Sequence, residues 1–282
     1  MKTLVKTNFH THCTFCDGKN TAEEMVQSAI ERNFDILGFS SHSMYPFASS
    51  WHVSVGRHGE YCTTIRDLAQ KYKDVISVLC GFEADYIEGL CAPDKSAYKE
   101  FAPDFLIGSV HYVTAKTGFF EADNTLLSVR KGIETHFGGD VRKAVQRYFQ
   151  LEREMLKNCS FDILGHPDLI RKQNTGTDNL FSEDEDWYRQ EVLETVEAIA
   201  DAHVCVEINT GGMARGYMRT PFPSPFFLEQ LHKHNVPVTI NSDSHAKNTI
   251  DYWFEDAKEY ARNAGYTELA YFTKDGMKMQ SI

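Results

Sequence analysis

The chain has 282 residues, of which 42% are hydrophobic and 24% charged, so it can bury a full core as one domain spanning residues 1–282. Its formal net charge is −11 and no run of Lys and Arg offsets it, so we expect no nucleic-acid partner. No apolar segment is long enough for a signal core or a membrane span, and the cysteine count of 7 is odd. These features predict a cytoplasmic protein with reduced thiols and no membrane partner.

Short apolar runs alternate with helical patterns along the whole chain. The candidate strands are 4–9, 36–40, 75–82, 105–110, 161–165, 204–209 and 236–240. A first helix is expected to begin at a capping box, Thr21-Ala22-Glu23-Glu24, and further helices at 59–73, 141–158, 183–203 and 224–235. The less regular segments are candidate rim loops, at 45–56, 115–139, 172–186 and 211–223.

This alternation of strands and helices predicts an α/β fold built on a parallel sheet. With seven strands, the sheet would form a closed or nearly closed barrel, one unit short of the eight-fold TIM barrel. Barrels of this kind place their chemistry at the carboxyl ends of the strands.

Several apolar runs end in residue types that bind metal ions. His10 and His12 have period-two spacing, so both rings point to the same side of a strand end, and Asp243 and His245 repeat the pattern after the last strand. Taken singly, each histidine would more often make an ordinary hydrogen bond, but their shared position at strand ends favours one site. The candidate ligands are His10, His12, Asp17, His42, Glu83, His111, His166, Asp243 and His245. Such a mixture of nitrogen and oxygen donors suits zinc, iron or manganese.

Cys13 and Cys16 form a Cys-x-x-Cys pair, which is typical of a zinc site or a redox dithiol. No second pair of this kind exists in the sequence, so a site of four sulfur ligands is excluded. Thiol ligation remains the lesser alternative, because His and Asp donors already occupy this loop.

Segments spread over nearly the whole chain also match the pattern of a known family: Asn8 to His12, Phe15 to Gly18, Gly38 to His42, Gly81 to Tyr86, Gly108 to His111, Leu164 to Leu169, Glu207 to Thr210 and Ser242 to His245. In them the chain resembles the PHP family, named for polymerase and histidinol phosphatase, and within it the monofunctional histidinol-phosphate phosphatases. Ser41 departs from the Asp, and Cys13 from the Thr, that many members have at these positions. Neither departure removes a predicted ligand.

The resemblance implies a distorted (β/α)7 barrel that holds three divalent ions, zinc, iron and/or manganese. One ion would be bound by His10, His12, Glu83 and Asp243; Glu83 would bridge to a second, held by His111 and His166; a third would be bound by Asp17, His42 and His245. The implied reaction is hydrolysis of the phosphomonoester L-histidinol phosphate to L-histidinol and phosphate, in histidine biosynthesis.

A phosphate substrate of an acidic protein needs local cations, and Arg171 and Arg215 are the first candidates, with Arg219 and Lys247 in reserve. The expected catalytic residues are Glu83, as the bridging carboxylate, and Asp243, as the proton donor to the leaving alcohol. An acidic or aromatic rim would suit the ammonium and imidazole groups of the substrate. Its candidates are Tyr45, His52, Asp85 and Asp168.

Three alternatives remain open. The first is a related phosphoesterase that acts on another small phosphate, such as a nucleotide or a sugar phosphate. The second is a metal-dependent amide or ester hydrolase, and the third is a catalytically silent accessory module. The sequence makes no prediction about the oligomeric state.

Overall fold

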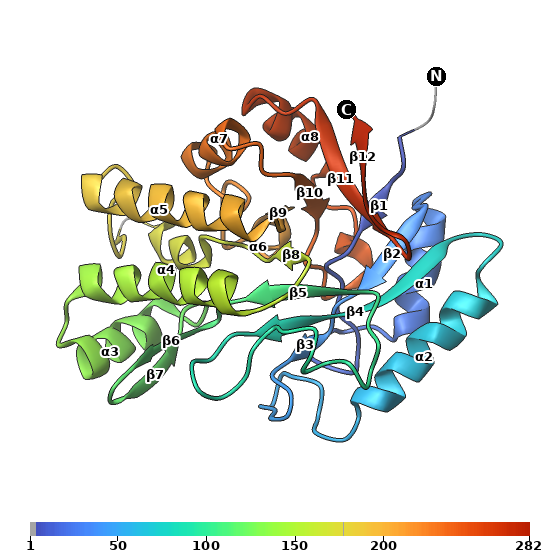
Figure 1. Cartoon of the computed structure of the whole chain (residues 1–282), viewed down its shortest axis with the longest axis horizontal. Coiled ribbons are helices and arrows are strands. Elements are labelled where there is room, and N and C mark those ends of the chain that lie inside the picture. The colour runs from blue at the N-terminus through green and yellow to red at the C-terminus, as the bar shows by residue number, and fades with distance from the viewer. Residues whose placement is uncertain (1–3, 177) are drawn as a thin grey trace.

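A computed structural model describes residues 4–176 and 178–282. Its centre is a parallel sheet with the strand order β1-β2-β4-β5-β8-β9-β10 (Figure 1). These seven strands are β1 (Thr7–Asn8), β2 (Ile36–Phe39), β4 (Ser77–Asp85), β5 (Phe105–Ser109), β8 (Ile163–Leu164), β9 (Cys205–Asn209) and β10 (Val238–Asn241). A short strand β3 (His42–Ser43) also pairs with β4. All seven predicted strands are therefore present.

The sheet is nearly closed into a barrel, because the segments that follow its two edge strands, β1 and β10, are hydrogen-bonded to each other. The backbone N–H of His12 donates to the carbonyl of Ser244 at 2.9 Å, and the N–H of Ser244 donates to the carbonyl of His10 at 3.1 Å. These two hydrogen bonds tie the first strand to the last at their carboxyl ends. The predicted α/β barrel of seven parallel strands is confirmed.

The helices lie around the outside of the barrel (Figure 1). They are α1 (Ala22–Glu31), α2 (His58–Lys71), α3 (Leu126–Phe137), α4 (Val141–Asn158), α5 (Asp186–Ala202), α6 (Gly211–Ala214), α7 (Pro225–Lys233) and α8 (Phe254–Asn263), with the 3₁₀ helices η1 (Leu169–Asn174) and η2 (Lys247–Thr249). The predicted capping box of α1 is confirmed, since Thr21 accepts from the Glu24 N–H and Glu24 accepts from the Thr21 N–H. None of the described helices combines the length and the apolar character needed to cross a bilayer.

Segment 115–139, expected as a loop, is largely regular. It contains strand β7 (Gly118–Glu121), which pairs with β6 (Tyr112–Ala115), and the whole of α3. Gly118 has φ +137°, a backbone conformation open to glycine, and it closes the tight turn of this hairpin. The hairpin of β11 (Glu268–Thr273) and β12 (Gly276–Ser281) and helix α8 were also not predicted.

Aromatic rings fill the inside of the barrel below the carboxyl ends. Phe9 packs edge to face on Phe105, with ring centroids 5.8 Å apart, and on Phe272 of β11 at 5.4 Å. A Cβ at Gly38 would lie 2.8 Å from the Phe105 ring, and one at Gly81 would lie 2.6 Å from it. Glycine at both positions gives the ring its space, so a packed apolar plug supports the polar residues above it.

Candidate metal centre

All nine predicted ligand residues gather at the carboxyl ends of the barrel strands. Their donor atoms fall into four groups, within each of which every atom lies within 4.8 Å of the others. These groups are His12, Asp17, His42 and His245; His10, His12 and Glu83; His10, His166 and Asp243; and His42, Glu83 and His111. Residues far apart in the sequence therefore share one place, as the strand-end pattern predicts.

Glu83, at the end of β4, lies at the centre of this cluster. Its Oε2 atom lies 3.0 Å from His10 Nε2 and 2.7 Å from His42 Nδ1. Its Oε1 atom lies 2.9 Å from His166 Nε2 and 3.3 Å from His111 Nε2. Burial alone would raise the pKa of Glu83, but the surrounding histidines hold that pKa well below its usual range. The side chain is thus a buried carboxylate with histidines on both of its oxygens.

Several of these buried atoms face one another without making hydrogen bonds. They are His10 Nε2, His12 Nε2, His42 Nδ1 and Glu83 Oε2. Burying polar atoms without partners costs free energy, and a buried charge costs more. Imidazole nitrogens and carboxylate oxygens that converge in this way are the donors that zinc and similar ions use. The residues present therefore fit a metal centre.

Two further carboxylates fix the orientation of the histidine rings. The two carboxylate oxygens of Glu207, in β9, lie 3.0 and 2.9 Å from His10 Nδ1. The same carboxylate accepts hydrogen bonds from the side chains of Asn209 and Asn241. Asp85 lies 2.6 Å from His111 Nδ1. Such contacts to the far nitrogen leave Nε2 free to face the cluster, and they are typical of metal-bound histidines. The sequence placed Glu207 in a segment that matches the family pattern but gave it no role in the site, although a carboxylate at the end of an apolar strand was the signal that identified Glu83.

Asp243 has a backbone conformation that is unusual for a residue other than glycine, with φ +46°. Its Oδ2 atom lies 2.9 Å from Nη2 of Arg215. A Cβ at Gly211 would lie 2.8 Å from the Asp243 Cβ, so glycine is needed for this close approach. Despite burial, Arg215 and the nearby histidines hold the pKa of Asp243 well below its usual value. An ionised carboxylate suits a metal ligand better than a proton donor.

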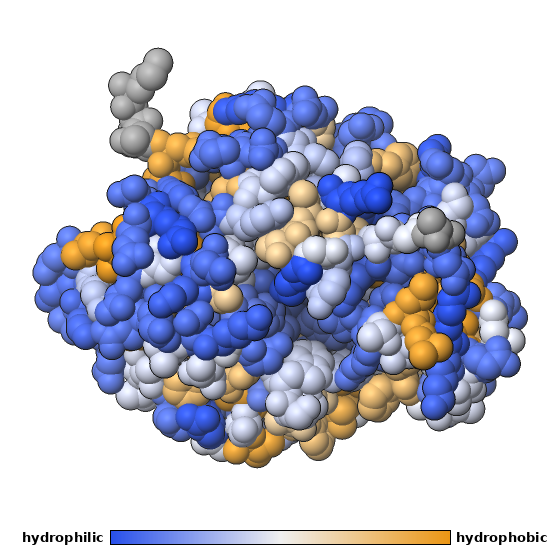
Figure 2. Space-filling view, turned by 180° about the vertical axis from the view of Figure 1, so that it is seen from behind, coloured by the Kyte–Doolittle hydropathy of each residue, from blue (hydrophilic) through white to orange (hydrophobic). Residues whose placement is uncertain are grey.

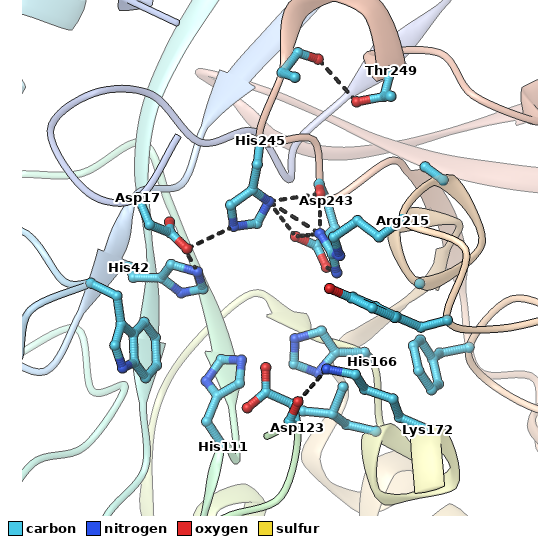
Figure 3. A pocket seen from close by; sticks show the side chains of 18 of the residues that line it. Asp17, His42, His111, Asp123, His166, Lys172, Arg215, Asp243, His245 and Thr249 are labelled. Atoms are coloured by element: carbon cyan, nitrogen blue, oxygen red, sulfur yellow. Dashed lines mark hydrogen bonds and ion pairs between the residues drawn. The ribbon is translucent and has the colours of Figure 1, made fainter. Parts of the chain in front are cut away.

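A cavity of about 690 Å³ opens above the cluster (Figure 3). Arg215 lines it as expected, together with Lys19 and Lys172. Six of the candidate ligands also line its wall: Asp17, His42, His111, His166, Asp243 and His245. Seen from behind the view of Figure 1, the surface of the molecule is mostly hydrophilic (Figure 2). The cavity thus combines the donor cluster with cations that could meet an anionic substrate.

Arg171, expected at the phosphate, does not line this cavity. Its guanidinium is buried and donates to Glu183 at 2.9 Å, to the Thr220 hydroxyl at 2.8 Å and to the Pro221 carbonyl at 3.2 Å. In the tight turn of η1, successive side chains point in different directions, and the next residue, Lys172, reaches the cavity instead. The reserve candidates, Arg219 and Lys247, do not line the cavity either.

The four residues expected at an acidic or aromatic rim also lie elsewhere. Asp85 and His52 are buried and hydrogen-bonded to each other, and Asp168 is buried beside Arg171. The hydroxyl of Tyr45 donates to Glu100. Apart from the candidate ligands, the acidic and aromatic residues that line the cavity are instead Trp51, Glu121, Asp123, Tyr217 and Phe222. Glu121 and Asp123 belong to the β6–β7 hairpin region that the sequence did not predict.

A seven-stranded barrel with a cluster of histidines and carboxylates at the carboxyl ends of its strands defines a class, the metal-dependent barrel hydrolases. Within that class the assignment is specific. Residues 8–211 match the model of the PHP domain, and the chain belongs to this family.

Named relatives cover nearly the whole chain. A protein of Deinococcus radiodurans named "Probable histidinol-phosphatase" is 26% identical over 91% of this chain and 92% of its own length. The histidinol-phosphatase of Lactococcus lactis subsp. lactis is 24% identical over 98% of this chain and 97% of its own. The crystal structure of a histidinol phosphate phosphatase from Lactococcus lactis, complexed with zinc, L-histidinol and phosphate, has a TM-score of 0.76 at 21% identity, and the match covers 98% of this chain and 100% of that one. This likeness shows a shared fold.

Proposed function

We propose that this protein hydrolyses L-histidinol phosphate to L-histidinol and phosphate and so serves histidine biosynthesis in the cytoplasm. The observation that carries the proposal is the buried Glu83 carboxylate, which lies within 3.3 Å of four histidine rings at the mouth of a PHP-family barrel. The names of the relatives from Deinococcus radiodurans and Lactococcus lactis support this choice of phosphomonoester.

The cofactors that we propose are three divalent ions, zinc, iron and/or manganese. His10, His12, Glu83 and Asp243 would hold one; Glu83, His111 and His166 a second; Asp17, His42 and His245 a third. The close contacts of Glu83 with His111 and His166, and of Asp17 with His42 and His245 at 3.7 and 3.3 Å, support this division. When bound, such ions activate water and neutralise charge on phosphoryl oxygens.

The protein's own side chains would bind the phosphoryl group and hold the metal ligands in position. Arg215 and Lys172 lie on the cavity wall, where their charges can bind the phosphoryl group. Glu207 and Asp85 hold the rings of His10 and His111 in place, so the donor set is organised before substrate arrives. Because Asp243 is held ionised, we assign its catalytic part to binding the ion and orienting Arg215 rather than to proton donation.

The test combines elemental analysis of the purified protein with phosphate release from L-histidinol phosphate. We expect up to three divalent ions per chain, turnover that is lost on chelation and restored by zinc or manganese, and a loss of at least about 100-fold in kcat for Glu83→Gln. A panel with a nucleoside monophosphate, a sugar phosphate and an aryl phosphate separates the nearest alternative. Equal kcat/KM on histidinol phosphate and the aryl ester would refute the specific assignment. Activity that survives complete removal of metal would refute the metal centre.

A further inference from the structure

The charged lining of the cavity contains one carboxylate that the protein leaves without a partner. Four carboxylates line the cavity, those of Asp17, Glu121, Asp123 and Asp243. Asp17 is paired with His245 at 3.3 Å, Glu121 accepts from Asn124 at 2.6 Å, and Asp243 is paired with Arg215 at 2.9 Å. Across residues 4–176 and 178–282, the Asp123 carboxylate has neither an ion pair nor a hydrogen bond. It is half-buried on the wall near His111 and His166 (Figure 3).

Lys172, beside it, is a cation without a carboxylate partner among the same residues. Its ammonium donates to the backbone carbonyl of Asp123, not to the carboxylate, and lies 4.4 Å from the centroid of the Tyr217 ring. Burial lowers the pKa of Lys172; the nearby negative charge of Asp123 opposes this shift, and the positive charge of Arg215 adds to it. Lys172 and Arg215 thus both line the cavity, and of these two cations only Arg215 forms an ion pair with a carboxylate among the described residues. The neighbouring positive and negative groups are both left facing the cavity.

Such a wall is complementary to a molecule that carries both charges. A free carboxylate near a bound phosphomonoester repels it, so Asp123 penalises every phosphate ester without a compensating cation. An ammonium group on the alcohol part of the substrate turns this repulsion into a charge-assisted hydrogen bond. A single carboxylate therefore both rejects the wrong ester and binds the right one.

We propose that Asp123 binds the ammonium of the leaving alcohol and makes the enzyme selective for phosphate esters of amino alcohols. This inference rests on the proposed function and adds to it the residue that recognises the alcohol. Trp51, Tyr217 and Phe222 supply the apolar part of the same wall, against which an imidazole ring can pack.

The first experiment needs no variant. It compares kcat/KM for L-histidinol phosphate with that for 3-(imidazol-4-yl)propyl phosphate, which differs only in having a hydrogen atom in place of the ammonium group. We expect the unaltered enzyme to prefer the amino ester by about 10- to 100-fold, the range of one hydrogen bond to a charged group. Equal kcat/KM on the two esters overturns the inference but leaves a phosphatase in place. If the enzyme hydrolyses neither ester, the proposed function itself is refuted.

The second experiment assigns the preference to Asp123. In Asp123→Asn, kcat/KM for histidinol phosphate should fall about 10- to 100-fold while that for the ester without ammonium changes less than about threefold. Glu121→Gln is the matched control, because it removes another carboxylate that lines the cavity. This carboxylate already accepts a hydrogen bond from Asn124, so its removal should leave the preference for the amino ester intact. An equal loss on both esters in Asp123→Asn would show a structural role and overturn the inference.

Binding provides a readout independent of turnover. Calorimetric titration with the product L-histidinol, in the presence of inorganic phosphate, should give a Kd about 10-fold higher for Asp123→Asn than for the unaltered protein. The Kd of the corresponding alcohol without ammonium should be the same for both proteins. An unchanged Kd for L-histidinol in Asp123→Asn contradicts the assignment.

Discussion

Oδ1 of Asp85 lies 2.6 Å from Nδ1 of His111, and the other oxygen of the same carboxylate lies 2.5 Å from Nε2 of His52. Ser49 completes the chain with its hydroxyl 2.7 Å from His52 Nδ1. The carboxylate therefore fixes the ring of a candidate ligand from behind, and His52 and Ser49 fix the carboxylate. The sequence suggested Asp85 and His52 as substrate contacts, whereas in the structure both are buried and Asp85 contacts His111, a candidate ligand.

Asp85→Asn should weaken the metal centre more than the fold. An amide keeps the shape of the side chain but loses the charge that orients His111, and loss of such a support typically costs 10- to 100-fold in metal affinity, roughly. The measurement is the metal content after dialysis against graded concentrations of a chelator. Asp74→Asn, at an exposed position on the surface, is the control and should bind metal normally. Retention of full affinity in Asp85→Asn would refute this role.

Lys172→Ala should impair the handling of phosphate without loss of metal. The side chain lines the cavity and its ammonium has no carboxylate partner among the described residues, so its removal takes away a cation from the phosphoryl site. We expect kcat/KM for histidinol phosphate to fall about 10- to 100-fold and inhibition by inorganic phosphate to weaken in parallel. Unchanged inhibition by phosphate would show that the ammonium lies outside the phosphoryl site.

Arg171→Ala should act in the opposite manner, on stability and not on KM. Its guanidinium is buried beside the buried Asp168 and also pairs with the half-buried Glu183, and removal of one partner of a buried ion pair costs about 3–5 kcal/mol. Urea denaturation of the metal-loaded protein measures this loss, and kinetics at a temperature where the variant is folded should show a nearly unchanged KM. A large rise in KM with unchanged stability would restore Arg171 as a phosphate contact.

The contribution of Glu152 to the free energy of unfolding should decrease as the pH rises. It is fully buried, its Oε1 accepts from the Tyr148 hydroxyl at 3.0 Å, and burial raises its pKa well above the ordinary value. A carboxyl whose pKa is raised on folding binds its proton more tightly in the folded state. Its contribution to stability is therefore complete below the unfolded pKa near 4.5 and is lost as the pH rises toward the folded pKa.

Glu152→Gln tests this dependence, because the amide can still accept from Tyr148 but cannot ionise. Relative to the unaltered protein, the variant should gain up to about 1.4 kcal/mol of unfolding free energy for each pH unit above 4.5, until the folded pKa is reached. Urea denaturation at pH 5 and pH 7 gives the difference, and subtraction of the two proteins cancels the titration of the metal centre. Glu197→Gln, on an exposed face of α5, should show no such trend. A constant difference between the two pH values would contradict the assignment.

The barrel and the clustering of the candidate ligands could be predicted because both follow from short-range patterns. A run such as Phe105–Ser109 followed by His111 specifies a buried strand and the end at which its ligand stands. Parallel strands then bring these ends together whatever the intervening sequence. The period-two spacing of His10 and His12 places both rings at the cluster for the same reason.

The walls of the cavity could not be predicted in this way. Lys172 and Arg171 are neighbours with similar chemistry, and only the turn of η1 decides which one reaches the cavity. Asp123 depends on the hairpin of β6 and β7, whose short strand Tyr112–Ala115 and turn at Gly118 were signals too short to separate from a loop. The cavity wall depends on such long-range packing, whereas the candidate metal centre depends on strand register.

The hydrogen bonds between His12 and Ser244 join the beginning of the chain to a segment made late in synthesis. Asp243 and His245 follow β10, so a growing polypeptide on the ribosome holds the two N-terminal histidines long before it contains these partners. Assembly of the complete candidate donor set must therefore wait until β10, Asp243 and His245 have been synthesised. Any binding of ions to the growing chain before that point would be confined to a partial site.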